Sequence, residues 1–276
     1  MSLGGGLRLV RATNLLIAAA GVLAGGWIAL GSIRLPTLLC FAAISGLSRG
    51  AAGNAWNDIC DAAADRVNRR PEERPLAAGR IGRGTADLIV FLGALVGLAA
   101  AALVSGRQLL AALAALAVML AYSPLLKPRP GAGNIAVALI AGLPPFYGAL
   151  AVGAPAAGVV PWVLAAWLHL AREIVKDVED EAGDRTIGRR TLPIVVGRRP
   201  AQVVAAGVAF LFVPASLLLP RLAAYGGAYF LIALPAQMGV LLAGTWLILG
   251  RVERVSALLK IAMVVGLVAL VAGKTA

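Results

Sequence analysis

Two aspartate triplets of identical spacing are the residues of this sequence best suited to chemistry. Asp58, Asp61 and Asp65 form the first triplet and are separated by three and then four positions. On a helix, positions three, four and seven residues apart share a face, so each triplet forms one acidic stripe. Of the 13 acidic residues, all except Asp87 and Glu253 lie in the two short stretches that hold the triplets. The second triplet, which repeats the spacing of the first, consists of Asp177, Asp180 and Asp184.

Carboxylates crowded on one stripe repel one another strongly unless a cation neutralises them. Oxygen ligands select a hard cation, and Mg²⁺ commonly joins one or two carboxylates to the phosphate groups of a substrate. Asn57 adds an amide to the first stripe, four positions before Asp61. Two such stripes that face each other indicate a diphosphate held between two metal ions. A solvated acidic loop paired with arginines is the alternative interpretation.

Basic residues near the triplets fit an anion site, because Arg forks clamp phosphate oxygens and Lys supplies a point charge. Lys127 follows Tyr122 at the end of an apolar run, between the two acidic stretches, and is a candidate phosphate ligand. Arg11 and Asn14, at the start of the first apolar run, are further candidates.

Two other polar residues leave alternatives open. His169, the only histidine, lies four residues before Glu173 and could act as a general base or belong to a polar network. Tyr147, close to Pro144, could line a substrate pocket or anchor its helix at the membrane surface.

The elements that position these side chains are expected to be membrane helices. Hydrophobic residues make up 60% of the 276 residues and mean hydropathy is +0.88, whereas soluble domains carry about 45–50% apolar residues. The apolar runs are long and lack the alternation of a membrane barrel, so we predict an all-α integral membrane protein of about nine transmembrane helices. The expected spans are 13–31, 36–56, 85–105, 108–126, 134–153, 158–174, 201–219, 226–249 and 256–273.

The formal net charge of +12 would suggest nucleic acid in a soluble protein. Here basic residues gather in the connections after the second and sixth runs, at 66–83 and 185–199, as is typical of cytoplasmic loops of membrane proteins. We therefore expect a multi-pass protein of the cell membrane with its N-terminus and both Asp-rich loops in the cytoplasm. We expect contact with membrane lipid, no nucleic acid and no obligatory protein partner.

Both triplets follow an apolar run, and an arginine follows each triplet directly, Arg66 and Arg185. This indicates a weak internal repeat, 36–126 and 158–249, within a single transmembrane domain, 1–276. Each repeat would deliver one acidic site to a common cavity.

Four short motifs resemble those of the UbiA superfamily of intramembrane prenyltransferases. Residues 57–65 match NDxxDxxxD, and 180–184 match the second family motif, DxxxD. Residues 74–79 resemble the family's RPL-xx-G element, and 122–127 resemble its YSPxLK element. The connection before the RPL element departs from the family's NRPxRPL, because 68–76 read NRRPEERPL.

The resemblance implies a helical bundle around a central cavity that opens laterally to lipid. Two Mg²⁺ ions would hold the diphosphate of geranylgeranyl or geranyl diphosphate, and a lipophilic acceptor would capture the allylic carbocation after pyrophosphate leaves. The metal site would comprise Asn57, Asp58, Asp61, Asp65, Asp177, Asp180 and Asp184. The diphosphate would be bound by Asn57, Arg74, Lys127, Lys176, Tyr122, Arg11 and Asn14, and catalysis would rest on Asp61, Asp65, Asp180, Asp184 and Lys127.

The stretch 172–180 bears on the identity of the acceptor. It resembles archaeal members that make ether lipids by transferring geranylgeranyl to the free hydroxyl of geranylgeranylglyceryl phosphate. An aromatic acceptor of quinone or heme synthesis, such as 4-hydroxybenzoate, is the alternative within the family. A secondary transporter is the alternative from another class, because internal repeats and intramembrane acids occur there too. A non-catalytic lipid-binding scaffold would give no reason for paired triplets.

Overall fold

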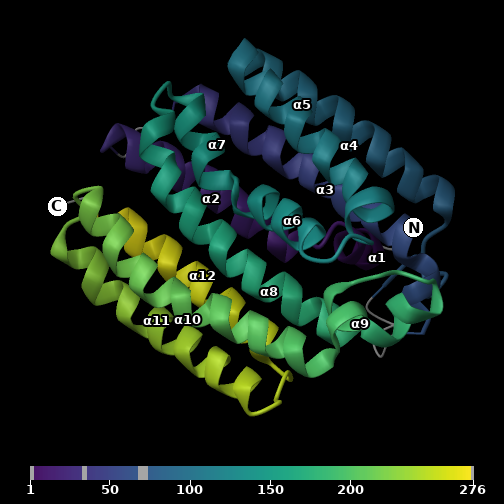
Figure 1. Ribbon diagram of the computed structural model, residues 1–276. Helices are drawn as coiled ribbons and strands as arrows, with labels where there is room; N and C mark the ends of the chain where they lie inside the picture. Colours follow the sequence, from purple (N-terminus) through teal and green to yellow (C-terminus); the bar gives the residue numbers. More distant parts are fainter. Residues whose placement is uncertain (1–2, 33–35, 68–73, 275–276) are drawn as a thin grey trace.

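The computed structural model describes residues 3–32, 36–67 and 74–274, and within these ranges every regular element is a helix (Figure 1). The prediction of an all-α protein is therefore confirmed. Arg34 and the segment 68–73 lie outside the described residues. The helices are α1 (Leu3–Leu9), α2 (Ala12–Leu30), α3 (Thr37–Asp65), α4 (Arg83–Val104), α5 (Gly106–Ala121), the π-helix η2 (Tyr122–Leu126), α6 (Ala132–Gly142), α7 (Pro144–Ala151), the 3₁₀ helix η3 (Pro155–Gly158), α8 (Val159–Thr186), α9 (Leu192–Val196), α10 (Arg198–Leu222), α11 (Gly227–Ile248) and α12 (Val255–Ala272).

Among the described residues, seven helical segments are long and apolar enough to cross a membrane, or eight if the bent pair α6 and α7 counts as one span. The second expected run, 36–56, is not among them. It is the first part of α3, where Arg49 and Asn54 lower the mean hydropathy. Several apolar helices of this length make the chain a multi-pass membrane protein.

Helices α3 and α8 continue past the ends expected from hydropathy. The expected runs stop at 56 and 174, but α3 continues to Asp65 and α8 to Thr186. Hydropathy falls where the carboxylates begin. The helix continues nevertheless, because its hydrogen bonds join backbone groups. Each aspartate triplet therefore lies on the last turns of a long helix.

Figure 1 shows the N-terminal helices in purple and blue on one side, the C-terminal helices in green and yellow on the other, and α6 and α8 between them. Helix α3 packs against α2, α4 and α5, while α8 packs against α6, α10 and α12. Helix α12 also contacts α2, so the two ends of the helical series meet.

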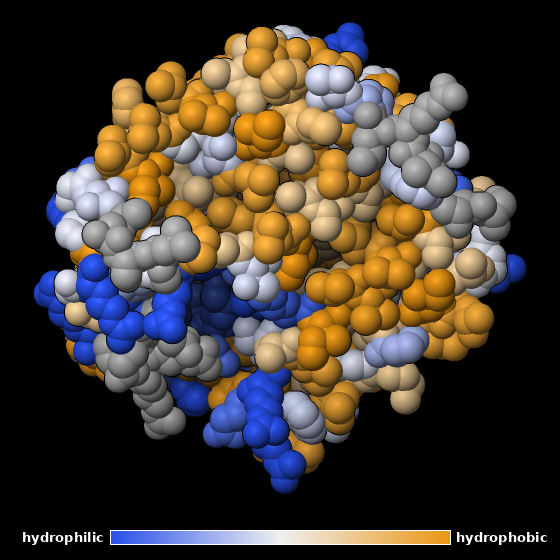
Figure 2. Space-filling view, turned by 180° about the vertical axis from the view of Figure 1, so that it is seen from behind, coloured by the Kyte–Doolittle hydropathy of each residue, from blue (hydrophilic) through white to orange (hydrophobic). Residues whose placement is uncertain are grey.

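Small residues form much of the interior, as expected where van der Waals packing holds helices together in lipid. Large apolar side chains face outward instead: Leu103 is 64% exposed, Leu222 74% and Leu231 71%. Figure 2 shows apolar residues over most of one face, with hydrophilic residues gathered around a hollow. An apolar surface of this kind suits contact with lipid tails.

Prolines interrupt the regular helical backbone at two points. Pro124 lies in the π-helix η2, where the Lys127 amide donates to the Tyr122 carbonyl over 2.7 Å. A π-turn widens the helix by one residue per turn and re-aims the side chains that follow it. Pro144 and Pro145 begin α7, and this break bends α6 and α7 by 44°.

The close contact between α2 and α7 generates a stability prediction. A Cβ atom on Gly148 would collide with the backbone carbonyl of Val22, which cannot move aside as a side chain could. We expect Gly148→Ala to lower the melting temperature of the detergent-purified protein, since overpacking costs about 1–3 kcal/mol. Gly207→Ala, whose Cβ would meet nothing within 4 Å, is the matched control. Equal melting temperatures for the two variants would contradict this account of the contact.

Candidate diphosphate and metal site

The first aspartate triplet is held by two arginines from outside α3. Asp58 is 2% exposed and accepts hydrogen bonds from Arg11 over 3.0 Å and from Arg74 over 2.8 Å. The same Arg74 places its Nε 3.5 Å from Asp65 Oδ2. Arg11 also donates to Asn57 over 2.7 Å. The arginines that precede α2 and follow α3 therefore converge on one acidic stripe.

Two cations bridge the two triplets. Lys127 lies 2.9 Å from Asp61 and 3.7 Å from Asp184. Arg189 donates to Asp184 over 3.1 Å and to the other carboxylate oxygen of Asp61. Asp61 and Asp184 are 3% and 1% exposed, so these contacts are shielded from solvent. The structure thus brings α3 and α8 together through their acidic ends.

The bridging cations keep their charge. Burial lowers the pKa of Lys127, but the carboxylates of Asp61 and Asp184 more than offset this and raise the pKa above its ordinary value. Burial likewise opposes the charge of Arg189, and the same two carboxylates raise its pKa. Both side chains are therefore available as cations for an anionic ligand at neutral pH.

The second triplet is less fully paired than the first. Asp177 accepts a 2.7 Å hydrogen bond from Asn134 of α6. Asp180 is half-buried, lines the cavity and has no hydrogen-bond or ion-pair partner within the described ranges. On the first stripe, the Asn57 amide donates to Asp61 and to Ser123 of η2, each over 2.9 Å. The π-helix that carries Lys127 therefore also contacts the first stripe.

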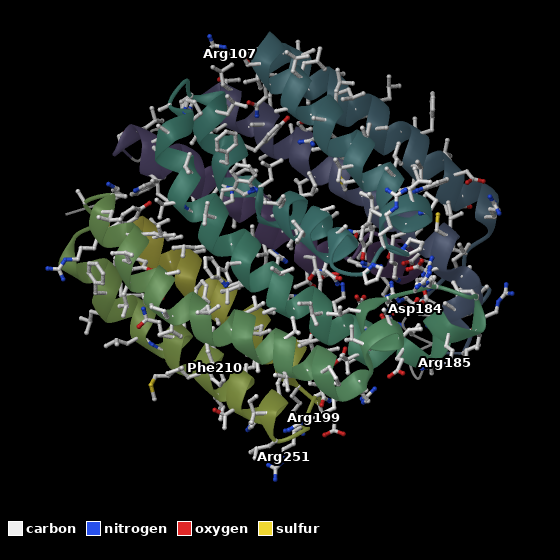
Figure 3. All side chains as sticks on the ribbon, in the orientation of Figure 1. Arg107, Asp184, Arg185, Arg199, Phe210 and Arg251 are labelled. Carbon is white, nitrogen blue, oxygen red and sulfur yellow. The ribbon has the colours of Figure 1, made fainter. Side chains whose placement is uncertain are left out.

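Both stripes open into one cavity of about 370 Å³. Its walls come from α2, α3, α5, α6, α7, α8, α10, α11 and α12, and its polar end includes Asn57, Asp61 and Lys127. Figure 3 shows Asp184 beside α9, at the opposite end of the bundle from Arg107. The polar end of the cavity and the arginine-rich connections thus share one end of the molecule.

Not all the expected diphosphate ligands face the carboxylates of the two triplets. Asn57, Arg74, Lys127 and Arg11 contact the first triplet, and Tyr122 lines the same cavity. Asn14 and Lys176 also line the cavity, but their hydrogen bonds are with residues outside the two triplets. Asn14 accepts from Lys260 over 2.6 Å, and Lys176 donates to Glu173 over 2.8 and 3.0 Å.

The two open alternatives for His169 and Tyr147 are resolved in part. Tyr147 is 1% exposed and hydrogen-bonded to Ser45 over 2.8 Å, so it is not a surface anchor. It lines the cavity beneath Arg49, whose guanidinium carbon lies 4.6 Å from the ring centroid. His169 lines the cavity as well, and its Nδ1 is buried without a hydrogen-bond partner among the described residues.

The donor set fits a hard cation that is completed by another molecule. Asp65 Oδ2 and Asp184 Oδ2 are buried without hydrogen bonds among the described residues. Asp65 Oδ2 has an ion-pair contact with Arg74 at 3.5 Å, whereas Asp184 Oδ2 is free to coordinate. In the described part of the chain, no three acidic, His or Cys side chains are grouped closely enough to hold a metal ion by themselves. A cation bound here would therefore need oxygen atoms from a phosphate or from water, which is the usual coordination of Mg²⁺.

Asn134 and Arg189 belong to the site but were not predicted from the sequence. Asn134 is the only amide in the apolar run 134–153, and a polar residue within a membrane span is a signal of function. Arg189 belongs to an arginine-rich loop in which no local pattern distinguishes one arginine from the next. Its role depends on the path of the chain after α8.

Buried acidic stripes that meet across a membrane cavity, with cations between them, define an intramembrane enzyme that acts on an anionic substrate. Residues 18–271 match the UbiA prenyltransferase family, and the chain belongs to that family. The resemblance expected from the four motifs is thereby confirmed.

Two similar relatives carry the same name. The chain is 38% identical over 274 residues to digeranylgeranylglyceryl phosphate synthase of Natronomonas pharaonis, covering 98% of this chain and 96% of the relative. It is 40% identical over 233 residues to the synthase of the same name from Thermococcus gammatolerans, with 83% and 82% covered.

Solved structures agree in fold. A digeranylgeranylglyceryl phosphate synthase structure superposes with a TM-score of 0.77 at 26% identity, covering 99% of this chain and 98% of that one. A UbiA homologue from Archaeoglobus fulgidus, solved with GPP and Mg²⁺, superposes with a TM-score of 0.69 at 20% identity, with 96% and 99% covered.

The bridge through Lys127 generates a prediction about metal binding. Lys127→Met leaves Asp61 and Asp184 with one cation fewer, and breaking a buried pair costs about 3 kcal/mol. We expect a lower melting temperature in EDTA and a larger rise on adding Mg²⁺ than in the unmodified protein. Arg129→Met, an exposed position on the same connection, serves as the control. A Mg²⁺ response unchanged by Lys127→Met would show that the metal does not bind beside this bridge.

Proposed function

We propose that this protein transfers a geranylgeranyl group from geranylgeranyl diphosphate to the free hydroxyl of geranylgeranylglyceryl phosphate. The product is a diether glyceryl phosphate of the kind found in archaeal lipids. The observation that carries the proposal is the meeting of the two triplets at Asp61 and Asp184, beside a cavity with apolar walls that Asp61 lines. Near full-length similarity to the two synthases supports the choice of acceptor.

The reaction breaks one bond and forms another. The bond between C1 of the donor and its diphosphate oxygen breaks, and its electron pair leaves with pyrophosphate. A lone pair of the acceptor hydroxyl oxygen forms the new C–O bond, and the hydroxyl proton is released. Lys127, Arg74 and Arg189 would stabilise the negative charge that develops on the leaving group. The apolar walls would keep water from the allylic cation.

The proposed metal site uses residues from both stripes. Asn57, Asp61 and Asp65 would hold one Mg²⁺, and Asp180 with Asp184 a second. Asp58 and Asp177 would orient their neighbours: Asp58 accepts from Arg11 and Arg74 through one oxygen, and Asp177 accepts from Asn134. When bound, Mg²⁺ supplies Lewis-acid stabilisation of the diphosphate.

The proposal extends to the number of membrane spans and their orientation. We propose nine spans, with α3 as the ninth beside the seven apolar segments and the pair of α6 and α7. The cavity between them would be the central reaction chamber of a single domain whose repeats, 36–126 and 158–249, each supply one acidic stripe. The polar end, with both Asp-rich loops and the N-terminus, would face the cytoplasm of the cell because its arginines follow the positive-inside rule.

An acceptor screen tests the function. Purified protein with Mg²⁺ and labelled geranylgeranyl diphosphate is offered geranylgeranylglyceryl phosphate or 4-hydroxybenzoate, with an EDTA blank for each. We expect a labelled ether only with the glyceryl phosphate, and none in EDTA. A product with 4-hydroxybenzoate alone would replace the proposed acceptor by an aromatic one. Product formation that persists in EDTA would refute the metal-dependent mechanism.

Asp180 offers the sharpest test of the second stripe. It has no partner in the described structure, so Asp180→Ala should leave the fold and melting temperature intact. We expect product formation to fall about 100-fold or more, the size of effect seen when one stabilising group is removed from a transition state. Asp87→Ala, which removes a half-exposed carboxylate facing Arg83 at the surface, should retain activity. Near-normal turnover by Asp180→Ala at saturating Mg²⁺ would exclude Asp180 from the site.

A further inference from the structure

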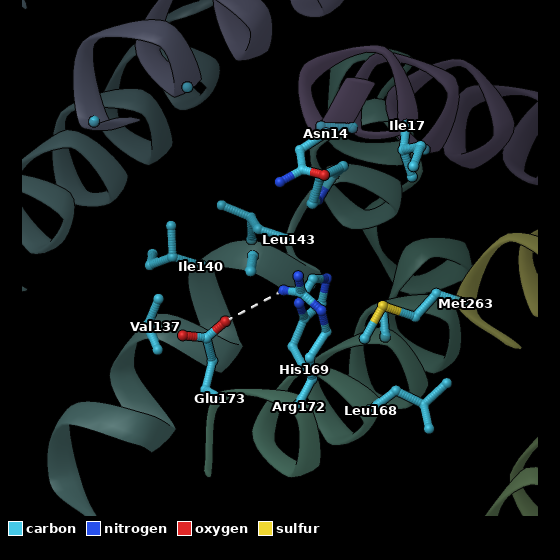
Figure 4. Close-up of a pocket in the computed structure, with 18 of the residues that line it drawn as sticks. Asn14, Ile17, Val137, Ile140, Leu143, Leu168, His169, Arg172, Glu173 and Met263 are labelled. Carbon is cyan, nitrogen blue, oxygen red and sulfur yellow. Dashed lines mark hydrogen bonds and ion pairs between the residues drawn. The ribbon is translucent and has the colours of Figure 1, made fainter. Parts of the chain in front are cut away.

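A second group of cations faces the cavity, apart from the bridge between the triplets. Arg172 and Lys176 extend from α8, and Lys260 extends from α12. Figure 4 shows Arg172 directed into the cavity with His169 beside it and Asn14 opposite, and Glu173 joined to Arg172 by an ion pair. We call Arg172, Lys176 and Lys260 the inner basic cluster.

The inner basic cluster carries more positive charge than the protein neutralises. Glu173 accepts from Lys176 over 2.8 and 3.0 Å and lies 3.5 Å from Arg172. Lys260 donates to Asn14 over 2.6 Å, and no described carboxylate pairs with it. Among the described residues, the three cations thus have one carboxylate partner between them, an excess of two positive charges. Such an excess near the membrane is costly unless a ligand supplies the missing anion.

Free hydrogen-bonding groups point to a ligand with several oxygen atoms. Arg172 Nε and His169 Nδ1 are buried, and neither has a hydrogen-bond partner among the described residues. An ammonium has three donors, and Lys260 uses one of them, on Asn14. A tetrahedral anion with oxygens on several sides can accept from all of these groups at once.

The position of Arg172 separates this part of the cluster from the diphosphate site, whereas Lys176 directly precedes Asp177. At 1.5 Å per residue, Arg172 lies about 18 Å along the α8 axis from Asp184 and about 8 Å from Asp177. Apolar side chains also line this part of the cavity: Figure 4 shows Leu143, Leu168 and Met263 around the same space. A charged group bound here would have apolar walls for an attached hydrocarbon chain.

We infer that the inner basic cluster binds the phosphate monoester of the lipid acceptor, while the two triplets and their cations bind the diphosphate of the donor. A phosphate monoester carries a charge of about −1.5 to −2, which matches the excess of two positive charges. Asn14 orients Lys260, and Glu173 orients Arg172 and Lys176. This inference rests on the proposed function for its choice of acceptor, and it assigns Lys176 to the acceptor phosphate instead of the diphosphate.

Comparing an acceptor with and without its phosphate tests the cluster. Lys260→Met is assayed with geranylgeranylglyceryl phosphate and with geranylgeranylglycerol, at saturating geranylgeranyl diphosphate. We expect the KM for the phosphorylated acceptor to rise about tenfold or more, the loss typical of one charged hydrogen bond. The donor KM and the KM for the phosphate-free acceptor should stay within about twofold of the unmodified enzyme, a change of under half a kcal/mol. Lys260→Arg should restore most of the affinity, and Arg251→Met, at an exposed position, should change nothing.

Two kinetic outcomes would overturn the assignment. An equal loss with both acceptors would mean that Lys260 acts on the fold and not on a phosphate. A rise in the donor KM with an unchanged acceptor KM would assign the cluster to the diphosphate.

A binding measurement separates this inference from the proposed function. Glycerol 1-phosphate in EDTA should raise the melting temperature of the unmodified protein but not that of Lys260→Met. If that difference is seen while the unmodified enzyme forms no product from geranylgeranylglyceryl phosphate, the phosphate site stands and the proposed function fails. If the enzyme forms that product but both proteins respond equally to glycerol 1-phosphate, the phosphate site is refuted and the function stands.

Discussion

Asp61 and Asp184 come from helices far apart in the sequence, yet their buried carboxylates lie within reach of the same two cations. Two anions so placed would repel each other and drive their helices apart, because a low-dielectric interior screens charge poorly. Lys127 and Arg189 convert this repulsion into attraction. The connection after η2, the loop after α8, and the ends of α3 and α8 are thereby held in one arrangement. The cavity at this end of the bundle depends on that arrangement.

Local departures from regular helix bring the basic side chains to this point. The π-helix at Tyr122–Leu126 aims Lys127 between the triplets. Arg11 adopts a left-handed backbone, with φ of 54°, before α2 and reaches both Asn57 and Asp58. A non-glycine residue in this region is strained by about 1–2 kcal/mol, and its contacts with the acidic stripe offset that strain. At both points, irregular backbone directs a basic side chain to the acidic stripes.

The cavity contains two regions of different charge balance along α8. At its polar end, acidic residues hold the protein's own cations, and beside that end Asp184 Oδ2 has no hydrogen-bond partner among the described residues. Farther along, Arg172, Lys176 and Lys260 outnumber Glu173. One region is suited to a diphosphate with its metal ions, and the other to an anion that arrives without metal. A reaction between two anionic lipids needs such a division, because two phosphorylated head groups would otherwise repel each other.

The sequence by itself determined the membrane class, seven of the nine expected spans, the two aspartate stripes and the family motifs. These features follow from hydropathy and from helical periodicity, which are properties of short segments. Tertiary structure alone decided that Arg189 bridges Asp61 and Asp184, that Asn134 binds Asp177, and that Lys260 faces Asn14. It also decided that Lys176 pairs with Glu173 although it directly precedes an aspartate of the second triplet. Partners such as Asn14 and Lys260, 246 positions apart, meet only because α2 packs against α12, and no local pattern encodes that contact.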